Sequence, residues 1–161
     1  IQVEFEGNIK SALNEISVSR KNTTSLITID TKLDNQYLNT YWADGLIIST
    51  PTGSTGYSLS CGGPIIMPDS KNFVLTPIAP HNLNARPLVI SDEKKIEISI
   101  NGRESEYFVS ADSKIFSVSI DSKLNISKAP HVLKMIEFED DSYINTLREK
   151  LMWGKDRRTE Q

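Results

Sequence analysis

The sequence predicts a mainly β fold, an antiparallel β-sandwich followed by one C-terminal helix. Short runs rich in β-branched residues alternate apolar and polar positions, for example at residues 96–100 and 116–120, as strands with one buried face do. Turn-forming residues separate these runs. Eight or more short strands at such close spacing favour an antiparallel sandwich over a parallel α/β sheet.

The first strands lie before the middle of the chain. Alternating or β-branched runs occur at residues 1–6, 16–18, 26–29, 37–42 and 46–48. Asp34-Asn35 separates two of these runs, and Asp44-Gly45 separates the last two as the turn of a hairpin would. A second interpretation of Asp44 stays open, because a turn exposes its first residue, which could then accept hydrogen bonds from a ligand.

The later strands follow the same rule. Asn101-Gly102 is the strongest short hairpin signal, because a type I′ turn needs positive φ at both central residues. It predicts that residues 96–100 fold back onto 107–109. A turn at residues 121–123 then joins the run ending at Ile120 to the run beginning at Leu124.

One helix is expected at residues 142–154. Tyr143, Ile144, Leu147 and Leu151 recur at helical spacing, Asp141 or Ser142 can cap the start, and Gly154 can end the helix. Residues 155–161 are polar and charged, which predicts a mobile tail after a single domain at residues 1–154.

Composition excludes several classes of protein. A length of 161 residues suits one domain, and a net charge of −3 argues against general affinity for nucleic acid or for anionic membranes. No apolar run approaches the roughly 20 residues of a membrane span. Cys61 is the only cysteine, so we expect a reducing, cytoplasmic location. His81 and His131 have no partners at metal-ligand spacing, so we expect no metal site in this chain.

The segment from Asp44 to Pro64 is the strongest candidate for a binding site. It contains five of the eight glycines and seven Ser or Thr residues, and glycine is used where something must approach the main chain closely. It has neither the Walker A lysine nor dinucleotide-fingerprint spacing, and no Lys or Arg occurs between Lys32 and Lys71. The alternative is a mobile Ser/Gly loop without a ligand.

Asn14-Glu15 interrupts the alternation before residue 16. An adjacent amide and carboxylate can bind a cis-diol, because the carboxylate accepts hydrogen bonds from both hydroxyls. The alternative is a strand edge whose polar residues face water.

Taken together, several segments resemble the NAD kinase family, in the family's order and over nearly the whole chain. These segments are Ala12-Leu13-Asn14-Glu15, residues 43–60 (ADGLIISTPTGSTGYSLS), Gly62-Gly63-Pro64, residues 76–81 (TPIAPH), Arg86-Pro87-Leu88-Val89 and the helix at residues 143–153. The resemblance implies a C-terminal β-sandwich domain and phosphoryl transfer from ATP or polyphosphate to the 2′-hydroxyl of the adenosine ribose of NAD, giving NADP.

The resemblance also implies site residues. It places NAD contacts at Asn14, Glu15, Asp44, Thr55, Gly56, Tyr57, Ser58, Ser60 and Ala79, with Asp44 at the nicotinamide end. Lys114 stands where members often place a Gln near the nucleotide. Gly56 replaces the usual Ala, which should only loosen the loop, and Trp42 replaces a frequent Arg, so no binding role is transferred to it.

The family's Gly-Gly-Asp-Gly motif, whose Asp acts as general base, occurs nowhere in the chain. It belongs to an N-terminal α/β domain, and the strand-like start at Ile1 predicts that this chain is cut from a longer protein. We therefore expect no catalytic residue here, an isolated chain that is inactive, and Mg²⁺ or another divalent metal bound with ATP only in the complete enzyme. Family members form dimers or tetramers, so a homo-oligomer is expected.

Two other functions remain open from sequence. A lipid kinase of the diacylglycerol kinase type shares the two-domain plan, although the Asn-Glu pair and the Thr-Gly-Ser-Thr-Gly-Tyr loop argue against it. A non-catalytic module for dinucleotide binding or assembly would also use such a sandwich.

Overall fold

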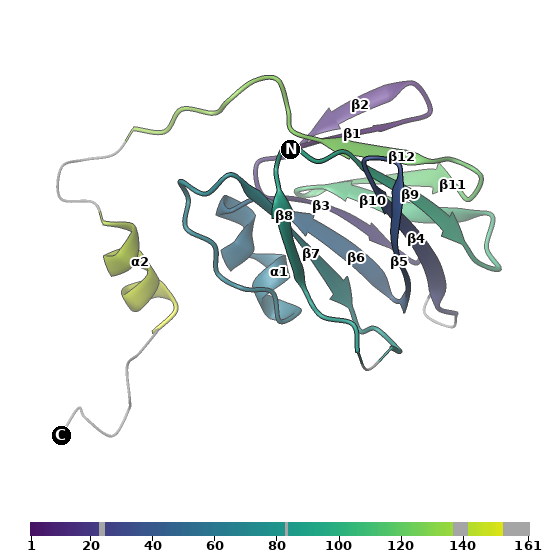
Figure 1. The fold of residues 1–161 in the computed structure, drawn as a ribbon, viewed down its shortest axis with the longest axis horizontal. Coiled ribbons are helices and arrows are strands. Elements are labelled where there is room, and N and C mark those ends of the chain that lie inside the picture. The colour runs from purple at the N-terminus through teal and green to yellow at the C-terminus, as the bar shows by residue number, and fades with distance from the viewer. Residues whose placement is uncertain (23–24, 83, 137–141, 153–161) are drawn as a thin grey trace. The chain divides into compact units, whose positions relative to one another are not determined.

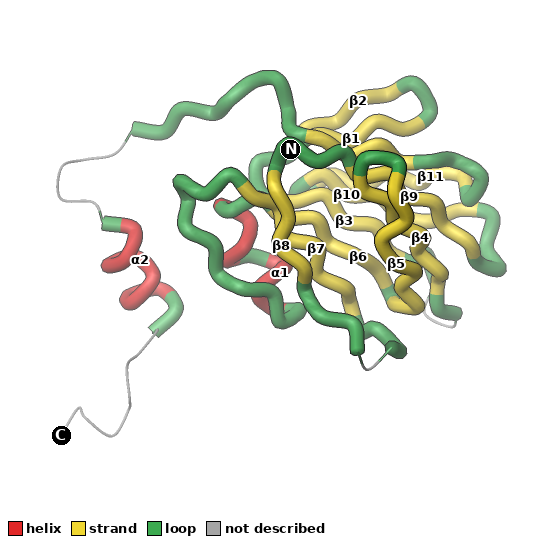
Figure 2. The backbone as a smooth tube through the Cα atoms, in the orientation of Figure 1, coloured by secondary structure: helices red, strands yellow, loops and turns green. Residues whose placement is uncertain are grey.

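The computed structural model describes residues 1–22, 25–82, 84–136 and 142–152. Two compact units divide the chain, Ile1–His131 and Val132–Gln161. The first unit contains the strands, and Figures 1 and 2 show them as two layers. The predicted antiparallel β-sandwich is confirmed.

Each layer is a six-stranded antiparallel sheet in the described part of the chain. The first sheet has the order β2-β1-β12-β9-β4-β5 and consists of β1 (Gln2–Phe5), β2 (Asn8–Ser11), β4 (Ile27–Leu33), β5 (Gln36–Ala43), β9 (Ile96–Asn101) and β12 (Leu124–Ser127). The second has the order β11-β10-β3-β6-β7-β8 and consists of β3 (Glu15–Ser19), β6 (Gly45–Ser49), β7 (Asn72–Ile78), β8 (Leu88–Ser91), β10 (Glu106–Ala111) and β11 (Lys114–Ser119).

The core lies between the sheets and is formed by alternate residues of their strands. Ile16 and Val18 of β3, for example, belong to the same buried cluster as Ile98 of β9. Ile47 and Val74 are also fully buried but lie outside that cluster. They occupy the opposite face of the second sheet, so the chain itself must cover part of that outer face.

The segment after β6 provides this cover, because it contacts β6. It forms a 3-10 helix, η1 (Thr52–Thr55), and one α-helical turn, α1 (Tyr57–Ser60). The alternative of an irregular Ser/Gly loop is therefore wrong for residues 52–60. Periodicity could not reveal elements of four residues, because it is read over windows of about 11–18 residues.

Turn prediction succeeded where both turn residues take positive φ. Asp34 and Asn35 have φ of 48° and 67° and join β4 to β5. The hairpin predicted at Asn101-Gly102 is wrong, because β9 pairs with β4 and β12 while β10 belongs to the other sheet. Neither of these two residues has positive φ, and the chain crosses between the sheets here.

The hairpin predicted at Asp44-Gly45 is also wrong. β5 lies in the first sheet and β6 in the second, so Asp44 forms the corner where the chain changes sheets. The Asp44 N–H donates to the carbonyl of Ile78 at 3.0 Å, and its carbonyl accepts from the N–H of Arg20 at 3.0 Å. Strand alternation on both sides of a corner looks the same as alternation on both sides of a hairpin.

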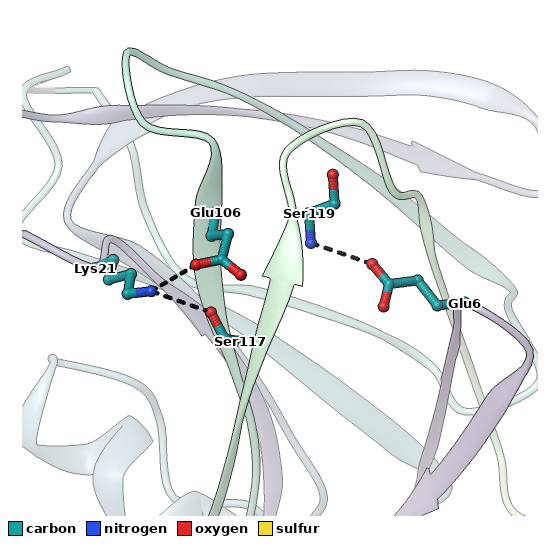
Figure 3. A network of polar contacts seen from close by, with 5 residues as sticks. All are labelled: Glu6, Lys21, Glu106, Ser117 and Ser119. Atoms are coloured by element: carbon teal, nitrogen blue, oxygen red, sulfur yellow. Dashed lines mark hydrogen bonds and ion pairs between the residues drawn. The ribbon is translucent and has the colours of Figure 1, made fainter.

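Polar contacts gather at the end where β3 finishes, and one of them ties the two sheets together (Figure 3). The Glu6 carboxylate, in the turn between β1 and β2, accepts from the N–H of Ser119 at 3.1 Å. Lys21, just after β3, donates to Glu106 at 2.6 Å and to Ser117 at 3.4 Å. The first contact links a hairpin of one sheet to the edge strand of the other.

The second unit contains the predicted C-terminal helix, α2 (Tyr143–Lys150), in which Leu147 is buried. Gly154 and the predicted tail at residues 155–161 lie outside the described residues. No helix in the described part of the chain is long and apolar enough to cross a membrane.

Candidate functional site

Asn14 and Glu15 lie where the chain enters β3, in the middle of the second sheet. Glu15 pairs with Ser49 of β6, and β10 flanks β3 on its other side. The alternative that these residues occupy a strand edge facing water is therefore wrong. The pair is instead held beside the glycine-rich segment, because the Thr50 N–H donates to the carbonyl of Asn14 at 2.8 Å and the Thr50 hydroxyl to that of Leu13 at 2.7 Å.

Two glycines allow this close approach. A Cβ atom on Gly53 would lie 2.1 Å from the carbonyl oxygen of Asn14, so no side chain fits there. A Cβ on Gly56 would lie 3.6 Å from Oε2 of Glu15. The glycine-rich segment thus packs its backbone against Asn14 and leaves the Glu15 carboxylate beside the start of α1.

The Glu15 carboxylate makes no hydrogen bond within the described structure. Its Oε2 atom is buried without a hydrogen-bond partner in the described structure, as is Oγ of the neighbouring Ser49. Burial raises the pKa of the Glu15 carboxyl, and the negative charge of Asp112 raises it further. A buried acceptor without a donor costs free energy, and a ligand hydroxyl at this position would remove that cost.

The start of α1 lies beside the Glu15 carboxylate. The Ser58 hydroxyl is fully buried and hydrogen-bonded to Thr76 at 2.8 Å, so it fixes α1 on β7. Thr55 is half-buried, whereas Gly56, Tyr57 and Ser60 are exposed. Burial raises the pKa of the Tyr57 hydroxyl, and electrostatic interactions with Cys61 and then Asp44 raise it further.

Asp44 and Ala79 line one pocket at the other end of β6. The pocket measures about 680 Å³ and is lined by Arg20, Ser25, Leu26, Asp44, Ala79, His81 and Arg103. Arg20 forms an ion pair with Asp44 at 2.9 Å. Ala79 has φ of 44°, a conformation that is strained for a residue with a Cβ and often marks a functional position.

The two regions lie at opposite ends of β6, whose own residues are all buried. β6 begins directly after Asp44 and ends at Ser49, the partner of Glu15. At about 3.4 Å per residue these two positions are roughly 17 Å apart along the strand. A ligand that contacts both regions would have to be extended and to cross the surface of α1, which covers β6. We call this path, from Glu15 over α1 to Asp44, the strip.

Sequence reasoning missed three residues that position the site: Thr50, Arg20 and Asp112. The carboxylate of Asp112 accepts hydrogen bonds from the N–H groups of residues 13–15. Lys114, which the resemblance placed near a nucleotide, is exposed at the start of β11, two residues after Asp112. A signal for Asp112 existed only in its strand–Asp–Ser–strand pattern, which predicts a turn and not a contact.

Comparison with known proteins gives a consistent result. The family model described as ATP-NAD kinase C-terminal domain matches residues 13–138. The NAD kinase of Christiangramia forsetii is 63% identical over 147 residues, which are 91% of this chain and 50% of that protein. The NAD kinase of Porphyromonas gingivalis is 47% identical over 143 residues, 89% of this chain and 50% of that protein.

Solved structures agree. The yeast NADH kinase complexed with NADH superposes with a TM-score of 0.89 and 25% identity, over 99% of this chain and 51% of that one. An NAD kinase from Archaeoglobus fulgidus in complex with ATP superposes with a TM-score of 0.69 and 33% identity, over 80% of this chain and 50% of that one. The chain thus spans about half the length of the relatives it matches.

Proposed function

The chain belongs to the NAD kinase family as its C-terminal domain, and from this premise we propose that the whole protein phosphorylates the 2′-hydroxyl of the adenosine ribose of NAD, giving NADP. The phosphoryl donor is ATP or polyphosphate. This chain contributes the surface that binds NAD.

The buried, unpartnered Oε2 of Glu15 is the observation that carries this proposal. A carboxylate oxygen in this state accepts hydrogen bonds from hydroxyl groups, and a ribose offers two adjacent ones. The side chain of Asn14 lies next to it in sequence and makes no hydrogen bond to the described residues. Together they suit a ribose diol at one end of the strip.

The remaining predicted residues lie along η1 and α1 and at the Asp44 end of β6. Thr55, Gly56, Tyr57 and Ser60 offer backbone and side chains along α1 to the dinucleotide. Asp44 and Ala79 line the pocket for the nicotinamide end. The buried Ser58 hydroxyl holds α1 on β7 through Thr76. Lys114 lies near the nucleotide.

Phosphoryl transfer itself requires groups beyond this surface. Transfer depends on positioning, a metal ion and neutralisation of charge, and the described residues contain no group of three or more His, Cys, Asp or Glu that could hold a metal. We assign the general base and the divalent metal with ATP to an N-terminal α/β domain of the whole protein. The isolated chain then binds NAD without turnover, and the whole protein is a cytoplasmic homo-oligomer.

Calorimetric titration of the chain with NAD tests this proposal. We expect measurable binding that weakens about tenfold or more in Glu15→Ala and Asp44→Ala, as loss of a hydrogen bond to a charged group predicts. Glu4→Ala is the matched control, because Glu4 is an exposed carboxylate of β1 in the other sheet. Absence of NAD binding, or equal effects of all three substitutions, would overturn the proposal.

A further inference from the structure

The backbone that presents Asn14 and Glu15 is held by a carboxylate from another hairpin. The Asp112 Oδ1 atom accepts from the N–H of Asn14 at 2.8 Å and of Glu15 at 3.2 Å, and Oδ2 accepts from the N–H of Leu13 at 2.8 Å. The N–H of Asp112 in turn donates to the Glu15 carbonyl at 3.0 Å. Four hydrogen bonds therefore join one residue to three consecutive ones.

The local conformation makes this contact possible. Asp112 is the first residue of the two-residue turn between β10 and β11, where Ala111 pairs with Lys114. Its φ of 52° lies in the left-handed region, which Asp and Asn tolerate better than other residues with a Cβ. The turn aims a short carboxylate at three N–H groups that no strand partner satisfies.

The opposite side of the same backbone is fixed by Thr50. This residue satisfies the carbonyl groups of Leu13 and Asn14, while Asp112 satisfies their N–H groups. The main chain of residues 13–15 is thus clamped on both sides, and the side chains of Asn14 and Glu15 are left without hydrogen bonds within the described structure.

The charge of Asp112 has two opposing effects. A second carboxylate near Glu15 is repulsive, whereas hydrogen bonds from three N–H groups to a carboxylate are charge-assisted and hold the geometry more tightly than bonds to a neutral acceptor. Both oxygens are also needed, since they serve different N–H groups. Asn at this position would keep the turn and one acceptor but would present an amide NH₂ to a second N–H donor.

We propose that Asp112 is a positioning residue for NAD binding, which acts by fixing the backbone of residues 13–15 so that Asn14 and Glu15 meet the ribose hydroxyls without rearrangement. Asp112 does not touch the ligand. The inference rests on the proposed NAD site, and it assigns to this site a residue that lies 98 positions away from Asn14 in sequence.

The test is a double-substitution cycle on NAD affinity at a temperature where all variants are folded. Asp112→Asn is expected to weaken NAD binding about tenfold. Glu15→Gln weakens it as well, and the double variant loses less affinity than the sum of the two single effects, because Asp112 acts partly through Glu15. A residue with a purely structural role would change the melting temperature but would not show this lack of additivity.

The matched control is Asp34→Asn. Asp34 also starts a two-residue turn with φ of 48°, its Oδ1 accepts from the N–H of Lys95 at 3.0 Å, and its N–H donates to the carbonyl of Lys95 at 2.9 Å. It lies in the first sheet between β4 and β5. We expect this variant to keep the NAD affinity of the wild type.

A second measurement keeps the test informative if Asp112→Asn is unstable. Amide hydrogen exchange in the native state should become faster at residues 13–15 in Asp112→Asn and not in Asp34→Asn. Unchanged exchange there, an unchanged NAD affinity of Asp112→Asn, or fully additive effects with Glu15→Gln would overturn the positioning role. If the wild-type chain itself does not bind NAD, the proposed function fails, and this inference fails with it.

Discussion

At the scale of single residues, the site combines a stability cost with a binding role. Glu15 holds a buried oxygen without a partner, close enough to Asp112 for their charges to repel. Proteins often keep such unfavourable groups where a ligand will later satisfy them. The pH dependence of folding should reveal this cost.

Glu15→Gln is expected to change stability in a pH-dependent way. The pKa of Glu15 is raised in the folded protein, so its favourable contribution is complete below the ordinary pKa and is lost as pH rises through the raised value. The free energy of unfolding of the variant, relative to wild type, should therefore be higher at pH 7 than at pH 4. Urea denaturation at both values measures this, and a difference independent of pH would contradict it.

Gly53→Ala tests the close approach of the glycine-rich segment. The new Cβ would lie 2.1 Å from the carbonyl oxygen of Asn14, so the backbone must shift. We expect a loss of about 1–3 kcal/mol in the free energy of unfolding, as for other overpacked sites. In the control Gly102→Ala the Cβ would lie 3.5 Å from Cγ2 of Ile27, an ordinary contact. Equal stability of the two variants would argue against the close approach of Gly53 to Asn14.

At the scale of elements, the fold is held together by connections between the sheets. The Glu6 carboxylate in the β1–β2 turn accepts from the Ser122 hydroxyl at 2.6 Å and from the Ser119 N–H, and these bonds lower the pKa of Glu6, the Ser122 bond most. The stability that they provide is present above the ordinary pKa of Glu6 and is lost as pH falls through the lowered value.

We therefore expect Glu6→Gln to be less stable than wild type at pH 7 and equally stable in acid, where the wild-type carboxyl is protonated. Thermal unfolding followed over a pH series measures the gap. Glu4→Gln, two residues earlier on β1, serves as the control. A gap that persists unchanged into acid would mean that the contact in Figure 3 does not act through the charge.

Local sequence predicted the strands but not all of their partners. Alternation identifies a half-buried strand because it depends on the strand's own residues, and Asp34-Asn35 identifies a turn for the same reason. Asp44-Gly45 and Asn101-Gly102 looked equally local, yet both mark crossings between the sheets. Whether two strands pair or separate is decided by packing over the whole domain, which the turn residues do not encode.

For the site too, some residues could be predicted from the sequence and others could not. Family resemblance supplied Asn14, Glu15, Asp44 and Ala79, and the structure brings Asp44 and Ala79 into one pocket. Asp112 could not be found from local sequence, because its hydrogen-bond partners are nearly a hundred residues distant in sequence.

At the scale of the whole molecule, all proposed contacts lie in the first compact unit, Ile1–His131. A chain ending at His131 is therefore expected to retain a cooperative unfolding transition and the NAD affinity of the full chain. Circular dichroism and calorimetry compare the two proteins. Loss of the folded state, or of NAD binding, would show that the second unit completes the site.

We propose that NAD binds on the outer face of the second sheet, over α1, between the Glu15 end and the Asp44 end of β6. Chemical-shift mapping by NMR during an NAD titration tests this most directly. We predict shifts concentrated at residues 13–15, 44, 55–60 and 79, with the outer face of the first sheet unaffected. Saturable shifts confined to that other face, or no shifts at millimolar NAD, would contradict the account.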